Sequence, residues 1–265
     1  MATNPSNSSA IRLSGATLTL GGRRLWGGLD LQVEPGEFVA VLGPNGTGKT
    51  SLLKVLLGLV PLTKGRVEVA GEMPVRSRGL CGYVPQQRSF DADLPVRGRD
   101  IVRFGLDGGR FGWRRSARED ELVNRALAEV GAEHFADGPM GRLSGGEQQR
   151  LRIAQALVGD PQVLLCDEPL LSLDLSHQQA VTALIDRRRR EANTAVLFVT
   201  HEINPILASV DRVLYLVNGR WAIGTPKEVL TTERLTELYG APVDVVNVRG
   251  RLVVVAGSET GGHHD

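Results

Sequence analysis

Short apolar runs alternate with amphipathic segments along most of the 265-residue chain. Between residues 11 and 41, hydrophobic and polar positions alternate over short stretches that are interrupted by pairs of glycines. This pattern predicts antiparallel strands joined by tight turns. Residues 38–42 (FVAVL) are apolar without interruption, which indicates a strand buried on both faces. Residues 67–69 and 81–84 are predicted as further short strands.

From residue 144 onward, helical and strand patterns alternate. The predicted helices cover 144–158, 176–191 and 203–208, and the predicted strands cover 162–166, 195–199 and 212–217. This order is typical of an α/β fold with a mainly parallel sheet. Residues 243–255 have the pattern of a terminal hairpin that turns at Arg249-Gly250.

Residues 89–142 differ in character, because they contain few strand-forming residues. Two helical stretches, near 98–105 and 118–130, are separated by Gly108, Gly109 and Gly112. We predict a helical subdomain inserted into the α/β domain. The expected organisation is a disordered stretch at 1–10, a domain at 11–240 that contains the insertion, and a hairpin with a flexible tail at 241–265.

Composition narrows the classes of function only slightly. Hydrophobic residues make up 42% of the chain and charged residues 23%, as in an ordinary globular protein. The net charge of +1 gives no electrostatic argument for binding nucleic acid. Cys81 and Cys166 form no disulfide or zinc pattern, and we expect both in the core. The basic tract Arg187–Arg190 is expected at the solvated end of a helix.

The strongest chemical motif is a glycine-rich segment after the strand at 38–42. Residues 43–50 (GPNGTGKT) fit the phosphate-loop pattern G-x-x-x-x-G-K-[ST], and the strand–loop–helix context disfavours a chance match. Glycines let the backbone wrap closely round phosphate oxygens, and the N–H groups at the helix start face the anion. Lys49 would lie near the β- and γ-phosphates, and the Thr50 hydroxyl could bind Mg²⁺. The predicted nucleotide-binding residues are Gly43, Pro44, Asn45, Gly46, Thr47, Gly48, Lys49, Thr50 and Ser51.

Two acidic residues end the apolar strand that precedes Pro169. An acid at the carboxyl end of a parallel strand is well placed to hold Mg²⁺. We predict that Asp167 holds the metal and that Glu168 acts on the attacking water as a general base or orienting group. A solvated strand end is the alternative for this pair taken alone.

Residues 143–150 (LSGGEQQR) have two interpretations. Ser144 and Glu147 form a capping box at the start of an amphipathic helix, whose buried side would carry Leu151, Ala154, Leu157 and Val158. The same helix start, with Ser144, Gly145 and Gly146, is also a potential anion site. These residues alone favour the capping interpretation.

Together with other motifs, the LSGGEQQR run resembles the signature sequence of the ABC ATPase family. Gln86 resembles the family's Q-loop glutamine, Ser172-Leu173-Asp174 its D-loop and His201 its switch histidine, all in the family's order. The resemblance covers about residues 11–225. It implies a P-loop NTPase (RecA-like) core with an N-terminal antiparallel β subdomain, which hydrolyses ATP with Mg²⁺.

The resemblance also implies a role for each motif. Two subunits would stack head to tail around two ATP molecules, so that Ser144, Gly145 and Gly146 of one face the phosphate loop of the other. Gln86 would bind Mg²⁺ and sense the attacking water, and His201 would contact the γ-phosphate. Asp174 would couple the two sites across the interface.

One position departs from the family. An aromatic residue near the start of the family's domain stacks on adenine, but Leu20 occupies that place. Trp26 is expected to pack in the core instead. Loss of stacking predicts adenine binding weaker by ~1–2 kcal/mol and a relaxed choice of nucleobase, and it leaves the stacking residue open.

Residues 82–96 and 238–255 are similar to the branch of the family that serves manganese, zinc and iron importers. This similarity implies a homodimer at the cytoplasmic face of the membrane, bound to an integral membrane permease and served indirectly by an extracytoplasmic solute-binding protein. In the family, the surroundings of Gln86 receive a permease helix, so Ser89–Val96 would touch the partner, while Phe90 could equally be core. The His263-His264 tail is expected to be polar rather than a metal site.

Two other functions remain open. The first is an ABC transporter ATPase for another substrate or for export. The second is an ABC ATPase that acts on ribosomes or DNA, which normally needs two nucleotide-binding cores or a long coiled-coil insert.

Overall fold

The computed structural model describes residues 9–86, 95–106 and 116–256. The predictions at Phe90, at Gly108–Gly112 and at His263-His264 lie outside these ranges. Among the described helices, none is both long enough and apolar enough to cross a membrane.

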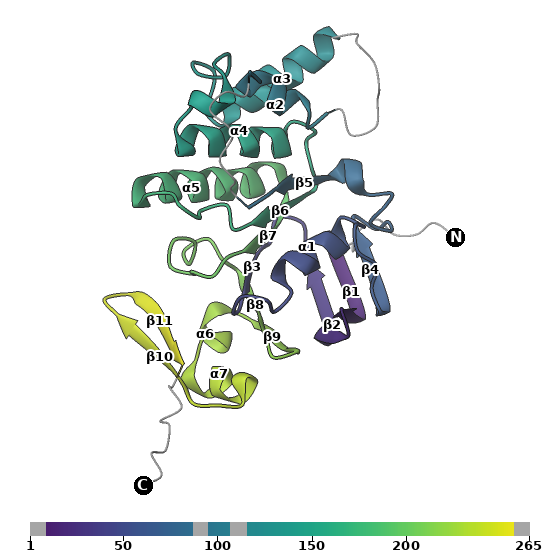
Figure 1. Cartoon of the computed structure of the whole chain (residues 1–265), viewed down its shortest axis with the longest axis vertical. Coiled ribbons are helices and arrows are strands. Elements are labelled where there is room, and N and C mark those ends of the chain that lie inside the picture. Colours follow the sequence, from purple (N-terminus) through teal and green to yellow (C-terminus); the bar gives the residue numbers. More distant parts are fainter. Residues whose placement is uncertain (1–8, 87–94, 107–115, 257–265) are drawn as a thin grey trace.

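A six-stranded sheet forms the centre of the molecule (Figure 1). Its strand order is β5-β6-β7-β3-β8-β9. The strands are β3 (Phe38–Leu42), β5 (Cys81–Val84), β6 (Val163–Asp167), β7 (Ala195–Val199), β8 (Arg212–Val217) and β9 (Arg220–Gly224). All neighbours pair in parallel except β8 and β9, which confirms the predicted, mainly parallel sheet.

The apolar strands are buried on both faces, as their uninterrupted hydrophobic patterns predict. In β3, Val39 and Val41 join one hydrophobic cluster, while Phe38, Ala40 and Leu42 join the other. Successive side chains of a strand point to opposite faces, so a sheet covered on both sides needs apolar residues at every position. Cys166 is buried as expected, but Cys81 is only half-buried because β5 is an edge strand.

A second sheet lies beside the first and is antiparallel, as predicted. Its strands are β1 (Ile11–Leu20), β2 (Arg23–Val33) and β4 (Lys64–Val69), in the order β2-β1-β4. Helix α1 (Lys49–Leu56) packs against both sheets, because Leu52 and Leu53 share a cluster with Leu18 and Val41. Trp26 is fully buried in this cluster, which confirms its expected place in the core.

Three helices, α2 to α4, lie at one end of the molecule, and α5 lies between them and the central sheet (Figure 1). The four helices are α2 (Gly98–Arg103), α3 (Ala117–Glu129), α4 (Gly145–Leu157) and α5 (Leu175–Ala192). Short 3₁₀ turns occur at Arg78–Leu80, before β5, and at Met140–Arg142, before α4. Helices α2 and α3 pack on α4, which in turn contacts β5 of the central sheet. The predicted buried side of α4 is confirmed for Leu151, Ala154, Leu157 and Val158.

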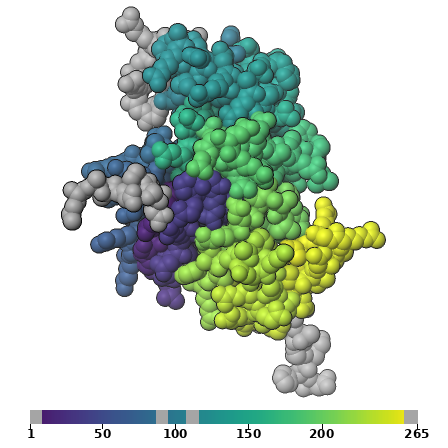
Figure 2. Space-filling model, turned by 180° about the vertical axis from the view of Figure 1, so that it is seen from behind, coloured from purple at the N-terminus to yellow at the C-terminus, as the bar shows by residue number. Residues whose placement is uncertain are grey.

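The C-terminal hairpin is confirmed, and it projects from the body of the molecule (Figure 2). Its strands are β10 (Val243–Val248) and β11 (Arg251–Ala256), joined at Arg249 and Gly250, whose φ angles of 52° and 83° are both positive. Helices α6 (Pro226–Val229) and α7 (Thr232–Tyr239) precede it. The sequence pattern did not predict these helices or β9.

The predicted helix at 203–208 is wrong, because this segment forms consecutive turns. The N–H of Ile206 donates to the carbonyl of Ile203, and that of Ser209 donates to Ile206, so the bonds span three residues instead of four. Pro205 has no N–H to donate. Ile203 and Ile206 are both buried, which explains the apolar pattern without a helix.

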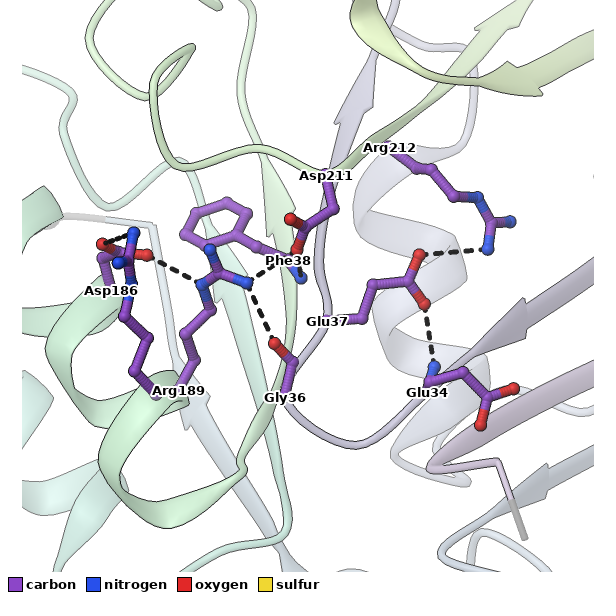
Figure 3. Close-up of polar contacts among 9 residues, drawn as sticks. Glu34, Gly36, Glu37, Phe38, Asp186, Arg189, Asp211 and Arg212 are labelled. Atoms are coloured by element: carbon purple, nitrogen blue, oxygen red, sulfur yellow. Dashed lines mark hydrogen bonds and ion pairs between the residues drawn. The ribbon is translucent and has the colours of Figure 1, made fainter. Parts of the chain in front are cut away.

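The expectation that Arg187–Arg190 lies at the solvated end of a helix is confirmed for Arg187 and Arg190, which are exposed, but is wrong for Arg188 and Arg189. The side chain of Arg189 is 11% exposed and donates to Asp186 and Asp211, at 2.7 Å each, and to the carbonyl of Gly36 at 3.0 Å (Figure 3). Arg188 is 12% exposed and pairs with Asp160. The tract therefore ties α5 to loops that are distant in the sequence.

Candidate functional site

A cleft of about 1060 Å³ opens where the parallel strands of the central sheet end. It is lined by the predicted loop residues Gly43, Pro44, Asn45, Gly46, Gly48, Lys49, Thr50 and Ser51, and by Gln86, Glu168 and His201. These residues come from four segments that follow β3, β5, β6 and β7. The carboxyl ends of parallel strands are where α/β proteins bind ligands.

Two glycines give the loop its shape, because no side chain fits at either position. Gly43 has a φ of 137°, and a Cβ built there would lie 2.0 Å from the carbonyl oxygen of Leu216. Gly48 has a φ of 94°, and its Cβ would lie 2.9 Å from Nε1 of Trp26. The loop is thus pressed against β8 on one side and against β2 on the other.

Lys49 lies inside the turn of this loop. Its Nζ donates to the carbonyls of Gly43 at 2.7 Å and Pro44 at 2.9 Å, and the Thr47 hydroxyl also donates to Pro44. Burial lowers the pKa of Lys49, while the charges of Glu168 and Asp167 oppose this shift. The loop therefore surrounds the largely buried ammonium group of Lys49 with carbonyl groups. Lys49 also lines the cleft.

Asp167 ends β6 beneath the loop and is 3% exposed. The Thr50 hydroxyl donates to its Oδ1 at 3.0 Å, and the Tyr83 hydroxyl lies 3.4 Å from its Oδ2. Burial raises the pKa of this carboxyl group, a shift that the Thr50 hydrogen bond opposes. A buried carboxylate beside a hydroxyl is an oxygen-ligand pair of the kind that Mg²⁺ prefers, and a cation would relieve the cost of burying it.

Glu168 turns sharply away from the strand. Its φ of 48° lies in the left-handed region, which a non-glycine residue adopts only where surrounding structure enforces it, and its N–H donates to the carbonyl of Val199. Its carboxylate lies 3.7 Å from Nδ1 of His201. The side chain of Glu168 is 15% exposed and that of His201 is 54% exposed, so both can reach a molecule in the cleft.

The remaining predicted residues lie outside the cleft. Ser144 caps α4, because its hydroxyl accepts from the N–H of Glu147 while the Glu147 carboxylate accepts from the N–H of Ser144. Gly146 packs under the ring of His177, whose Nδ1 lies 2.7 Å from the carboxylate of Asp174. His177 thus connects Gly146 of the signature run to Asp174, a contact that the sequence did not predict.

Several cleft residues were not predicted from the sequence. Leu25, Asn204 and Tyr215 line it, together with Leu252, Val253 and Val254 of the hairpin. Tyr83 does not line the cleft but contacts Asp167, and it could have been found, since it lies three residues before Gln86 at a predicted strand end. The hairpin residues could not, because no pattern places a terminal hairpin beside a distant loop. Leu20 is 42% exposed and does not line the cleft, whereas Leu25 of the next strand does.

Comparison with known proteins agrees with these features. The model of the ABC transporter family matches residues 27–171. The zinc import ATP-binding protein ZnuC of Yersinia enterocolitica is 36% identical over 234 residues, which cover 88% of this chain and 86% of that protein. ZnuC of Yersinia pestis is 36% identical over 231 residues, 87% of this chain and 85% of its own length.

Solved structures show the same architecture. An inward-facing transporter described as of the metal-chelate type is 26% identical with a TM-score of 0.79, over 96% of this chain and 99% of that one. CbiO1 of Clostridium perfringens, part of the cbiONQ transporter complex, is 26% identical with a TM-score of 0.74, over 87% of this chain and 94% of that one. The dimeric cassette MJ0796 is 27% identical with a TM-score of 0.68, over 81% of this chain and 98% of that one. The chain therefore belongs to the ABC transporter family and carries the ATPase domain of that family.

Proposed function

We propose that this protein is the ATPase subunit of a transporter that imports a divalent metal ion through a separate membrane permease. The observation that carries the proposal is its 36% identity, over 88% of the chain, to a protein named for zinc import. The similarity to a transporter described as of the metal-chelate type supports the same class of cargo.

The residues at the cleft would have separate roles in ATP hydrolysis. Lys49 and the N–H groups of the loop bind the β- and γ-phosphates. Thr50, Asp167 and Gln86 would hold Mg²⁺, which would neutralise charge on the phosphate oxygens. Glu168 orients and deprotonates the attacking water, and His201 contacts the γ-phosphate.

The second half of each site comes from a second copy of the chain. Ser144, Gly145 and Gly146 at the start of α4 bind the γ-phosphate held by the partner, and Asp174 couples the two sites. The dimeric MJ0796 cassette supports this arrangement. The permease anchors the dimer at the cytoplasmic face of the membrane, and an extracytoplasmic solute-binding protein delivers the metal.

The test combines chemistry and transport in one strain. Cells that lack the protein should take up less ⁶⁵Zn, ⁵⁴Mn or ⁵⁵Fe under metal starvation, and the wild-type chain should restore uptake. Glu168→Gln should fail to restore it, because loss of a general base lowers turnover about 10²–10⁴-fold. Glu202→Gln, an acid that lines the same cleft, is the matched control and should restore uptake. Normal uptake of all three isotopes without the protein would remove the metal assignment.

A further inference from the structure

One side chain joins the loop that carries His201 to the C-terminal hairpin. The Nδ2 of Asn204 donates to the carbonyl of Leu252 at 2.9 Å, and the N–H of Leu252 donates to Oδ1 of Asn204 at 2.8 Å. The amide of Asn204 thus makes both hydrogen bonds that a neighbouring strand would make with this residue. Both residues are half-buried, so water competes only in part.

The register of the hairpin explains why Leu252 is available. Val248 pairs with Arg251 across the two-residue turn, and Asn247 pairs with Leu252. The pair that closes a two-residue turn exchanges both hydrogen bonds, and bonded and non-bonded pairs then alternate. The N–H and carbonyl of Leu252 therefore point away from β10, toward the outer edge of β11, where Asn204 lies.

The opposite edge of the hairpin is held by α7. The N–H of Val243 donates to the Thr236 hydroxyl at 3.1 Å, and the N–H of Val245 donates to the Thr232 hydroxyl at 2.9 Å. An isolated two-stranded hairpin is marginally stable in water. Here it is fixed on one side by α7 and on the other by Asn204, so it forms a bridge between these two elements.

The loop itself has few other restraints. Residues 201–210 form turns without a regular helix or strand, and the hydroxyl of the preceding Thr200 bonds to the backbone of nearby Glu202. Within the described ranges, the hydrogen bonds of Asn204 are the ones that tie residues 201–210 to a distant element. Buried Ile203 and Ile206 anchor the loop by packing, which leaves the direction of His201 to be fixed by polar contacts.

We propose that Asn204 is a positioning residue for ATP hydrolysis, through which the C-terminal hairpin holds His201 toward the γ-phosphate. The proposal rests on the proposed function. Asn204 is three residues from His201, and both line the cleft together with Leu252. The hairpin thereby becomes part of the catalytic apparatus, and anything that moves it alters the rate of hydrolysis.

The kinetic test uses the full chain. Asn204→Ala should lower kcat about tenfold, because a displaced catalytic group slows the chemical step, and should change KM for ATP less than about twofold. Asn247→Ala is the matched control, because its Oδ1 only accepts from Gly250 within the turn. It should leave kcat within about twofold of the wild-type value.

A double variant decides whether Asn204 acts through His201. If it does, adding Asn204→Ala to His201→Ala should change kcat less than about twofold, because the group that it positions is already absent. Two independent effects that multiply in the double variant would overturn the proposal. So would an unchanged kcat in Asn204→Ala.

Hydrogen exchange separates this proposal from the proposed function. Asn204→Ala should speed amide exchange both in residues 201–210 and at Leu252, whereas Asn247→Ala should leave residues 201–210 unchanged. Unchanged exchange in either segment of Asn204→Ala would overturn the link. If the wild-type protein exchanges as expected but hydrolyses no ATP, the proposed function fails, and the role of Asn204 in hydrolysis fails with it.

Discussion

At the scale of single residues, two buried groups of opposite charge lie at the phosphate loop. Asp167 is buried with a raised pKa, and Lys49 is buried with a lowered pKa. Each shift has burial as its largest cause, so each group is held at a cost that a charged ligand would offset. A nucleotide with a divalent cation supplies both charges: the phosphates are negative and would face Lys49, and the cation is positive and would face Asp167.

Lys49 provides the first prediction. Lys49→Met should weaken ATP binding about 10–100-fold, because a hydrogen bond to a charged group contributes about 1.5–3 kcal/mol. Calorimetric titration measures this change. Lys54→Met on the same helix is the control, since Lys54 is exposed and should leave the affinity unchanged. An unaltered dissociation constant for Lys49→Met would contradict the assignment of the phosphate loop.

The sequence predicted residues of this site where a contiguous motif marks them. The phosphate loop, the Asp167-Glu168 pair and Gln86 follow strand ends, and the parallel sheet brings such ends together. Asn204 and Leu25 were not predicted, because their roles depend on contacts with residues that no local sequence pattern specifies. Asn204 makes its two bonds to a backbone 48 residues away.

At the scale of elements, hydrophobic periodicity predicted which side chains of a segment are buried, but not which other segments they contact. The double-sided burial of β3 follows directly from its apolar run. The turns at 203–208 were predicted as a helix because Ile203 and Ile206 are three residues apart. That spacing places two side chains on one face of a helix, and it also lets both be buried in consecutive turns. The arginines at the end of α5 were expected in solvent, because the carboxylates of Asp160 and Asp211 that meet them lie in other loops.

Arg189 provides the prediction for this scale. Its guanidinium joins α5 to Gly36 before β3 and to Asp211 before β8, and it lies 6.0 Å from the centre of the Phe38 ring (Figure 3). Arg189→Met should lower the free energy of unfolding by about 2–3 kcal/mol, because it removes the three hydrogen bonds that a largely buried guanidinium donates.

Urea denaturation measures this loss, and Arg190→Met is its control. Arg190 is 63% exposed and pairs only with Asp186, at 2.9 Å, so its loss should cost less than about 1 kcal/mol. Equal stabilities of the two variants would show that the network in Figure 3 contributes nothing beyond an ordinary surface ion pair.

At the scale of the whole molecule, the residues of the proposed nucleotide site lie in two separate places. The cleft lies between the phosphate loop and the hairpin, whereas Ser144 and Gly146 lie at the start of α4 and do not line it. A capped helix start that presents free N–H groups is an anion site only where an anion can reach it. Within one copy, the phosphate held by the loop would not be beside that helix start, so the proposed function needs a second copy to supply it.

This separation predicts a dimer that depends on ATP. Glu168→Gln should bind ATP without hydrolysing it, and size-exclusion chromatography with light scattering should find it as a dimer with ATP and a monomer without. The nucleotide joins the two copies, and a ligand at 100 times its dissociation constant contributes about 2.7 kcal/mol to the state that binds it. Glu168→Gln combined with Lys49→Met is the control, because it keeps the surface of α4 but loses the phosphate contact. A Glu168→Gln protein that binds ATP and stays monomeric at micromolar concentrations would contradict a site shared between two copies.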